Sequence, residues 1–591
     1  MMTPEELDLG DLAFPCLFLD QEGWKSLSDK LDDPFFAQLH QDNVAALETL
    51  LREVPRIGSR PLKSRLQRAV VGWYLTGDER YLELAFSTLE LCCEHTELWW
   101  FGGDYVEGLR AADLSTGEML YNVAFGVDAL YAYLPVSLKE RCLRTLIDEG
   151  LRAYLQGVEL KDWWVDCDFN WNSALHANAG LAALIVRPID RALSDKVLGH
   201  VLAGLPHMIE AFYPDGGWIE GVMYFNTAIG HLTDFVAPLH RLTGEDLGVL
   251  NNVDIQDTIT WKLYMWGGDD RVLNFSDVSE FTWPLGLPHL YWWSHHLHRP
   301  DWTWDNDRRI SAEHGRPGLF HDIESFWYRE SFAPTEPPQL APLRHFEGID
   351  WLTWHGEHTW LGFRSGFNGG NHDNDDLGTF VLGYDEERFL CDPGYRVNLA
   401  SEHNCITVRD YEQTDYATAR ITQLAPLDGG FYLRCDIQEA FPLATARYNR
   451  HLLLIDDAHV LVIDDVLCRP AFRNYTRAYL QTRLQPEATS DGWRIAGEHA
   501  TLQVRVLSES GFHRTDNWTH RRNRGQPIHR ISWRDAHDRD HSVHVALLTF
   551  GDPKVDCTID GSGVRLTVDA KHYDFSYKNK ALVLEATSCA G

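Results

Sequence analysis

The chain has 591 residues, of which 44% are hydrophobic, so it is long enough for two or three globular domains and is not a disordered protein. Its formal net charge of −34 at pH 7 excludes a nucleic-acid-binding protein and argues against binding to an anionic membrane surface. An acidic substrate stays open, because a cleft can be locally positive in a negative protein.

The 11 cysteines are scattered and contain no C-x-x-C pair. They predict neither a disulfide framework nor a thiolate zinc site, and buried free thiols favour a reducing compartment. The N-terminus shows no apolar signal segment, and no window is long and apolar enough to span a membrane. We expect a cytoplasmic protein, or a periplasmic or secreted one if a leader has been trimmed from the sequence.

The first half of the chain has the pattern of successive helices. Apolar residues recur at helical spacing in a series of segments separated by short loops with Gly, Pro and Asp. These segments are 62–75, 81–93, 117–133, 137–155, 172–186, 193–212, 222–242 and 253–266. Antiparallel helix pairs must bury their apolar faces against neighbouring pairs, as a solenoid or a closed toroid.

The pattern changes at a proline-rich segment, Ser331–Pro342. Short β-type runs follow, and Asp456–Ala458 is a hairpin signal between two of them. The runs are 351–354, 359–363, 379–382, 451–455, 459–463, 479–483, 543–550, 564–568 and 581–584. Strands at this spacing predict an antiparallel sandwich. We therefore predict a multidomain α+β protein with a helical domain over 1–330, a linker over 331–345 and a β-sandwich over 346–591.

Polar segments in both halves of the chain carry side chains suited to proton transfer. Tyr213–Tyr224 ends in a tyrosine after a glycine-rich turn, and Gly369–Phe380 holds His372 in a polar turn before an apolar strand. A third segment, Phe169–Asn172, adds two amides and an indole. Tyr, His and Asn together suit removal of the weakly acidic C5 proton of a uronic acid, followed by β-elimination of the glycosidic bond.

Four segments in this order resemble the heparinase II/III-like polysaccharide lyases: Gly117–Tyr131, Asn170–Asn172, Asp215–Tyr224 and His372–Phe380. The resemblance covers most of the chain and implies an (α/α) toroid followed by an antiparallel β-sandwich. It also implies cleavage of a uronate-containing polysaccharide or oligosaccharide to 4,5-unsaturated products. A glycosaminoglycan such as hyaluronan, chondroitin or heparan sulfate is the first expectation for the substrate, and alginate is the second. No organic cofactor is expected, and the assembly is a monomer or a homodimer.

Each catalytic role has a structural alternative. Tyr224 is the candidate acid, and a second role as the base would need local positive charge, because a phenol has an ordinary pKa of about 10; otherwise it is a buried helix aromatic. The resemblance makes His372 the candidate base or a polarising partner, and the alternative is a turn-capping histidine. Asn170 is the candidate that neutralises the substrate carboxylate. Asn172 competes for that role, and one of the two is expected to cap the helix that follows.

Other side chains are expected to bind the substrate. Indole faces suit the C–H faces of sugar rings, and Arg or His would supply local positive charge. Core packing and surface ion pairs are nevertheless the usual fates of such residues. The set is Asn172, His176, Trp171, Trp163, Trp164, Arg110, Arg364, His231 and Glu220.

The resemblance also points to a structural divalent cation, Zn, Mn or Ca, in the sandwich. The corresponding positions are Asn374, Asp392 and His403. Asn374 stands where a His is expected, and an amide oxygen suits a harder ion than zinc. The alternative is a hydrogen-bonded turn that holds no metal.

Two other functions stay open. A glycoside hydrolase on a toroid would use a pair of carboxylates such as Asp215 and Glu220. A non-catalytic carbohydrate-binding relative would keep the fold without the chemistry, although the joint presence of Asn170, Tyr224 and His372 favours the lyase. The sequence has no P-loop, dinucleotide-binding fingerprint or H-E-x-x-H motif.

Overall fold

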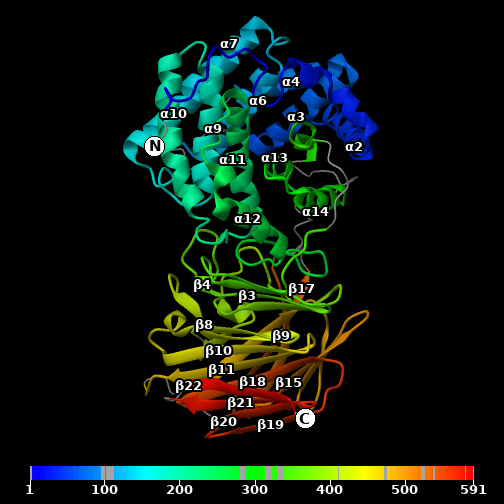
Figure 1. The fold of residues 1–591 in the computed structure, drawn as a ribbon, viewed down its shortest axis with the longest axis vertical. Coiled ribbons are helices and arrows are strands. Elements are labelled where there is room, and N and C mark those ends of the chain that lie inside the picture. The colour runs from blue at the N-terminus through cyan, green and yellow to red at the C-terminus, as the bar shows by residue number, and fades with distance from the viewer. Residues whose placement is uncertain are drawn as a thin grey trace. The chain divides into compact units, whose positions relative to one another are not determined.

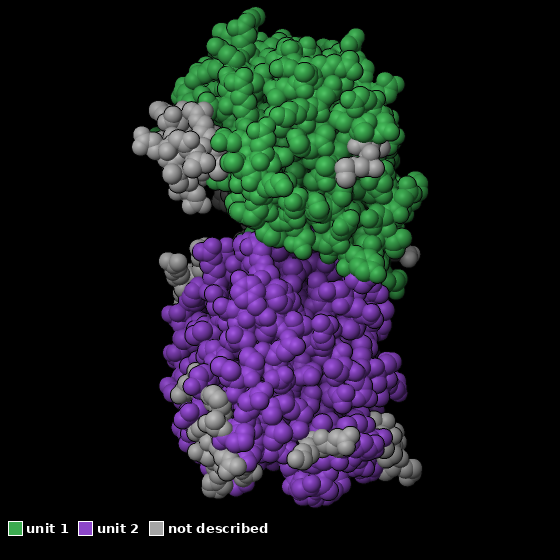
Figure 2. All heavy atoms as spheres, turned by 90° about the vertical axis from the view of Figure 1, so that its left-hand side faces the viewer, with its two compact units in different colours: residues 1–213, 223–259, 283–339 green, residues 214–222, 260–282, 340–591 purple. Residues whose placement is uncertain are grey.

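The structure, a computed structural model, describes residues 3–94, 100, 112–279, 286–312, 322–330, 337–409, 411–470, 475–520, 526–536, 540–578 and 581–589. Contacts divide the chain into two units, drawn in green and purple in Figure 2. Unit 1 comprises 1–213, 223–259 and 283–339, and unit 2 comprises 214–222, 260–282 and 340–591. The two short segments 214–222 and 260–282 therefore pack with the sheets, although both lie within the predicted helical part of the sequence.

Unit 1 is helical, and each predicted helical segment coincides with one or two observed helices. The helices (Figure 1) are α1 (Gln21–Lys25), α2 (Pro34–Leu50), α3 (Ser59–Thr76), α4 (Glu79–Cys92), α6 (Leu114–Ala129), α7 (Val136–Thr145), α8 (Arg152–Leu160), α9 (Asn170–Val186), α10 (Arg191–Glu210), α11 (Val222–Thr243), α12 (Val253–Tyr264), α13 (Leu290–His296), α14 (Pro300–Ser311) and α15 (Ser325–Tyr328). Within the described residues, no helix combines the length and the apolar composition needed to cross a bilayer.

The innermost helices of unit 1 are apolar on nearly every side. Almost every residue of α6 and of α9 is buried, as expected for helices surrounded by other helices. They cross so closely that a Cβ added to Gly117 would lie 2.2 Å from the carbonyl oxygen of Ala174. Glycine at this position therefore permits the contact between the two helices.

The helical array closes on itself, as a toroid does and an open solenoid does not. Late residues of unit 1 bind its first helices: the Arg68 guanidinium of α3 lies 2.7 Å from the Asp322 carboxylate. The Arg329 guanidinium lies 2.8 Å from Asp33. Lys30 donates to the carbonyl of Phe326 at 2.9 Å. These contacts join segments that are 254 to 296 residues apart in the sequence.

Unit 2 consists of antiparallel sheets. The strands are β1 (Leu343–Phe346), β2 (Trp351–His355), β3 (Thr359–Arg364), β4 (Gly366–Phe367), β5 (Phe380–Tyr384), β6 (Glu387–Leu390), β7 (Ile406–Val408), β8 (Thr418–Leu427), β9 (Gly430–Asp436), β10 (Thr445–Ile455), β11 (His459–Cys468), β12 (Thr476–Thr482), β13 (Pro486–Ala488), β14 (Gly492–Ala496), β15 (Thr501–Val506), β16 (Ser510–Thr519), β17 (Pro527–Asp535), β18 (His541–Phe550), β19 (Val555–Asp560), β20 (Gly563–Val568), β21 (Lys571–Lys578) and β22 (Ala581–Cys589). The hairpin predicted at Asp456–Ala458 is confirmed, because β10 and β11 pair directly across it.

A nine-stranded sheet, in the order β13-β14-β15-β18-β11-β10-β9-β8-β4, forms the middle of unit 2. Alternate residues of β10 enter two different cores. Leu452 and Leu454 pack in the core that the nine-stranded sheet forms with the sheets β1-β2-β3-β5-β6 and β16-β17-β12-β7. Leu453 and Ile455 pack on the other side, in the core formed with the sheet β19-β20-β21-β22. The continuous apolar run of β10 is thus explained by burial on both faces. The predicted sandwich is present, and the last four strands add a third layer.

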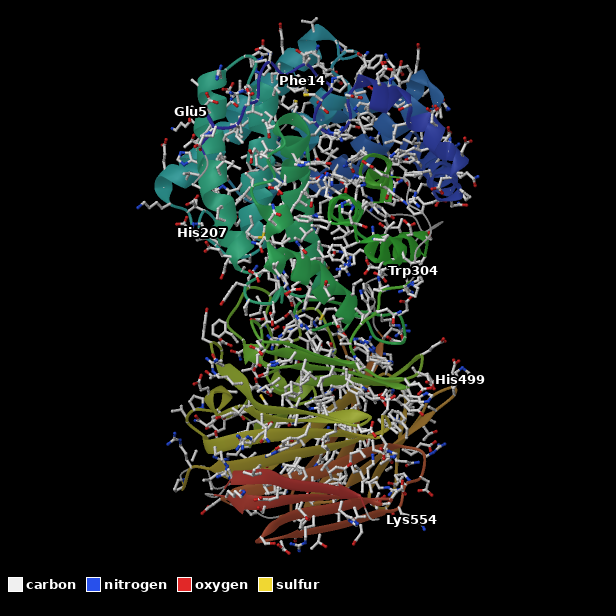
Figure 3. The ribbon with its side chains drawn as sticks, viewed as in Figure 1. Glu5, Phe14, His207, Trp304, His499 and Lys554 are labelled. Carbon is white, nitrogen blue, oxygen red and sulfur yellow. The ribbon has the colours of Figure 1, made fainter. Side chains whose placement is uncertain are left out.

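Side chains fill the space between these layers (Figure 3). The labelled His499 lies in the turn between β14 and β15, and Lys554 directly precedes β19. Every cysteine whose side chain is described is a free thiol, and most are buried. This agrees with the prediction from the cysteine spacing.

Candidate active site

The first turn of α9 carries both predicted asparagines. Asn170 is its first residue and only 2% exposed, and Phe169 is the N-cap, without a side-chain capping bond. The Asn172 amide donates to the carbonyls of Val165 at 3.0 Å and Gly204 at 3.1 Å. The prediction that one asparagine caps the helix is therefore wrong. Asn172 instead joins the preceding loop to α10.

The aromatic side chains next to Asn170, an exposed Trp163 and the half-buried Phe169 and Trp171, form a platform. The Trp163 ring is 57% exposed and stacks on Phe169, with centroids 5.6 Å apart and planes at 21°. It also lies 4.7 Å from the Trp171 ring. Exposed indole faces of this kind suit sugar rings. Both tryptophans were predicted from the sequence, whereas Phe169, whose ring stacks on Trp163, was not.

Trp164 and His176 point in the opposite direction, into the helical core. Trp164 is 1% exposed and packs 5.5 Å from both the Tyr154 ring and the His176 ring. His176 is fully buried, with Nδ1 2.6 Å from the Tyr154 hydroxyl and Nε2 3.0 Å from the Val165 carbonyl. Burial lowers the pKa of His176 to about 4. Both side chains are therefore part of the helical core and not of an exposed sugar-binding surface.

Tyr224 is half-buried in the first turn of α11. His231 lies two turns after Tyr224 in α11, and its Nδ1 accepts a hydrogen bond from Asn178 of α9 at 3.1 Å. Further along both helices, a Cβ added to Gly180 of α9 would meet the Phe235 ring of α11. The contacts advance along both helices together, so α9 and α11 lie side by side in the same direction (Figure 1). At 1.5 Å per residue, Asn170 and Tyr224 each lie roughly 11 Å before this contact. Both therefore occupy the same end of unit 1.

In unit 2, the loop between β4 and β5 carries His372 in a left-handed conformation, at φ 63°. Its Nδ1 lies 3.0 Å from the Asp277 carboxylate, whose other oxygen accepts the Arg396 backbone N–H at 2.7 Å. With Nδ1 as the donor, Nε2 carries the lone pair that a general base needs. Asp277 was not predicted, because no spacing in the sequence could indicate it.

Arg364, predicted to bind substrate, is fully buried beneath this loop. Its guanidinium forms ion pairs with Asp376 and, at 2.8 Å, with Asp373. Burial raises the pKa of the Asp373 carboxyl, although Arg364 and the Gly370 N–H act to lower it. Arg364 therefore shapes the loop that presents His372.

Glu220 is fully buried and accepts a hydrogen bond from the Asn371 amide at 2.8 Å, next to His372. Asp215, its partner in the hydrolase alternative, accepts the backbone N–H groups of Glu347 and Gly348. The Asp215 carboxylate thus stabilises the turn of the main chain at Glu347 and Gly348. The remaining predicted residue, Arg110, lies outside the described residues.

Among the described residues, a buried group of metal-ligating side chains comprises Asp376, Asp392 and His403, whose ligand atoms lie within 4.8 Å of one another. Two of these positions were predicted, and Asp376 was missed. Nε2 of His403 lies 2.8 Å from the Val397 carbonyl, which directs Nδ1 toward Asp392 at 2.9 Å. Oδ2 of Asp376 and the Asn374 amide oxygen make no hydrogen bond within the described chain. Two carboxylates and an oriented imidazole therefore fit a divalent cation.

No protein-family model matches the sequence, and no curated protein matches it. Solved structures match nearly the whole chain. A heparinase III aligns with a TM-score of 0.62 at 13% identity, over 98% of this chain and 92% of that chain. A mutant heparan sulfate lyase HepC from Pedobacter heparinus gives 0.61 at 13%, over 90% and 84%. The Streptomyces coelicolor A3 chondroitin AC lyase, in complex with chondroitin sulphate, gives 0.55 at 11%, over 93% and 87%.

These similarities confirm the predicted fold class, a toroid of helices followed by an antiparallel β-sandwich. The three structures named above are a heparinase, a heparan sulfate lyase and a chondroitin AC lyase. The family resemblance read from the sequence segments is therefore matched by the fold.

Proposed function

We propose that this protein is a polysaccharide lyase that cleaves a uronate-containing polysaccharide or oligosaccharide by β-elimination. The observation that carries the proposal is the Asp277–His372 pair, an imidazole held by a carboxylate in a loop that buried ion pairs shape. Such a pair is suited to proton transfer. The shared fold supports the same reaction class, since its solved examples bear the names of lyases.

In the proposed reaction, Asn170 hydrogen-bonds the uronate carboxylate and so stabilises the negative charge that develops when C5 loses its proton. His372 takes that proton through Nε2, while Asp277 stabilises the resulting imidazolium. The electron pair forms the C4–C5 double bond, and the glycosidic C4–O bond breaks. Tyr224 donates its proton to the leaving oxygen. Trp163 and Trp171 are proposed to stack on sugars beside the reacting uronate.

We also propose a structural cation at Asp376, Asp392 and His403. Two carboxylates and one imidazole suit zinc or manganese, and the Asn374 amide oxygen would favour a harder ion such as calcium. When bound, the ion would hold together the segments that precede β5, follow β6 and precede β7, which carry Asp376, Asp392 and His403. It has no place in the proton transfers, which use His372 and Tyr224.

The direct test follows ultraviolet absorbance with hyaluronan, chondroitin sulfate, heparan sulfate, alginate and polyglucuronate, because a 4,5-unsaturated product absorbs and a hydrolysis product does not. We expect absorbance to rise with at least one polymer and to be abolished by Tyr224→Phe. The matched control is Tyr213→Phe, because Tyr213 is 73% exposed in the preceding turn. Sugar release without absorbance would indicate a hydrolase, and full turnover by Tyr224→Phe would remove Tyr224 from the mechanism.

A further inference from the structure

The sheet β16-β17-β12-β7 carries an arginine-rich outer face. Residues that lie opposite each other on neighbouring strands form a row across the sheet, and their side chains point to the same side. Rows two residues apart along the strands share one face, and three such rows cross β16, β17 and β12. The rows are Phe512–Arg534–Arg477, Arg514–Ser532–Tyr479 and Asp516–Arg530–Gln481.

The intervening rows show which side is the outside. Trp533 and Ala478 belong to one such row, Ile531 and Leu480 to the next, and all four are buried in the main core of unit 2. The arginine rows therefore face away from the core. Arg514 has 54% of its side chain exposed, and Phe512 is 37% exposed.

The charge on this face is positive, although the protein carries −34 overall. Asp516 lies between Arg530, at 2.9 Å, and Arg514, at 3.1 Å, and these arginines hold the pKa of its carboxyl low against the effect of burial. The nearby Glu412 carboxylate accepts two hydrogen bonds from Ser401, from the backbone N–H at 2.9 Å and from the hydroxyl at 2.7 Å. Four arginines thus face Asp516 and Glu412, each of which already has a partner, and Glu402, whose carboxylate also acts on Arg530.

The face is also hollowed and aromatic. Arg477, Arg514 and Arg530 line a hollow of about 210 Å³. Its other lining residues are Tyr479, Ser401, Ser532 and the two paired carboxylates, Asp516 and Glu412. The Nε atoms of Arg477 and Arg534 are buried and make no hydrogen bond in the described part of the chain. Arg530 holds Asp516 in a bidentate pair, with both distances 2.9 Å, and so positions that carboxylate rather than a ligand. The planar guanidinium groups of Arg477 and Arg514 suit the binding of sulfate or carboxylate groups.

One loop connects this hollow to the proposed base. The backbone of Arg396 donates to Asp277, the partner of His372, and five residues later the Ser401 carbonyl accepts from Arg530 at 3.4 Å. Five residues span at most about 18 Å. A polymer of several sugars is therefore long enough to reach from the first position to the second.

We propose that this face is a second binding surface for an acidic polysaccharide, on which Arg477 and Arg514 hold sulfate or carboxylate groups of sugars away from the reacting bond. The identity of the ligand rests on the function proposed above. The surface itself does not take part in the chemistry.

The test measures binding of full-length protein to heparan sulfate, which carries sulfate, and to polyglucuronate, which carries carboxylate only. Tyr224→Phe is present throughout so that the polymers are not consumed. Arg514→Gln, and Arg477→Gln with Arg514→Gln, should weaken binding by about tenfold or more, and should flatten the salt dependence of Kd by about one unit per arginine. A loss limited to heparan sulfate identifies sulfate as the ligand, and a loss with both polymers identifies carboxylate as sufficient.

The matched control is Arg565→Gln, which removes the same charge from the distant sheet β19-β20-β21-β22. Unchanged affinity for both polymers in the double variant would overturn the proposal, as would an equal loss in the Arg565 control. The experiment distinguishes failure of the lyase proposal from failure of the binding-surface proposal. If the unmodified protein cleaves no polymer but its binding still depends on Arg514, the lyase assignment fails and this surface stands.

Discussion

Nδ1 of His372 lies 3.0 Å from Oδ2 of Asp277, which precedes it by 95 residues in the chain. The same residues are joined a second time, because the Asp277 backbone N–H donates to the His372 carbonyl at 3.0 Å. Both the ring and the backbone of the histidine are therefore held. An imidazole fixed in this way keeps its orientation without help from a substrate.

Replacing Asp277 by Asn should lower kcat by about 10²–10⁴-fold with little change in KM, provided that the lyase proposal holds. The amide keeps an oxygen for the Arg396 N–H, but it cannot stabilise an imidazolium and can favour the wrong tautomer of His372. Initial rates followed by ultraviolet absorbance measure the effect. Asp556→Asn, at an exposed position in β19, is the control, and turnover within twofold of the unmodified protein in Asp277→Asn would rule out the dyad.

Purified protein should contain about one divalent ion per chain, and chelation should lower the Tm of unit 2 by several degrees. Asp376→Asn should reduce the metal content because it removes a ligating carboxylate. Elemental analysis and thermal unfolding measure both quantities, with Asp556→Asn again as the control. Metal content near zero, together with a Tm that does not respond to chelator or to added Zn, Mn or Ca, would identify the cluster as a hydrogen-bonded turn.

Acid should destabilise unit 1 through His176, whose pKa is lowered by burial from 6.5 to about 4. Between these values the unfolded chain binds more protons than the folded one, so stability is full above pH 6.5 and falls as the pH drops toward 4. The maximum loss is on the order of 3 kcal/mol. Denaturant unfolding followed by far-ultraviolet circular dichroism should show a smaller loss between pH 7 and pH 4.5 in His176→Gln. Equal losses in both proteins would show that this residue does not govern the response.

Two glycines of α10 should respond oppositely to alanine. A Cβ on Gly204 would lie 2.2 Å from Nε2 of His176, so Gly204→Ala should cost about 1–3 kcal/mol by displacing the buried ring. The nearest atom to a Cβ on Gly199 is Cγ of Pro4 at 3.7 Å, so Gly199→Ala should stabilise by about 0.5–1 kcal/mol. Urea unfolding midpoints measure the pair. A stabilising Gly204→Ala would show that the ring relocates without cost.

The conformation of the His372 loop illustrates what could not be read from the sequence. The motif located the histidine, and the polar turn was recognised, but Arg364 was assigned to the substrate when it is the buried ion-pair partner of Asp373 and Asp376. Similarly, Asn172 was considered for catalysis and is used for packing against α10. An arginine or an amide has the same spacing in the sequence whether it faces a ligand or a buried carboxylate.

Local periodicity determined the helices, the main strands, the hairpin at Asp456–Ala458 and the order of the two folds, because these depend on neighbours three, four or two residues away. Only the tertiary structure could bring Asp277 to His372, Asp376 to Asp392 and His403, and four arginines to one face of a sheet. These groupings depend on strand register and loop closure between segments far apart in the chain, and no local pattern of side chains encodes which distant residue will be the partner.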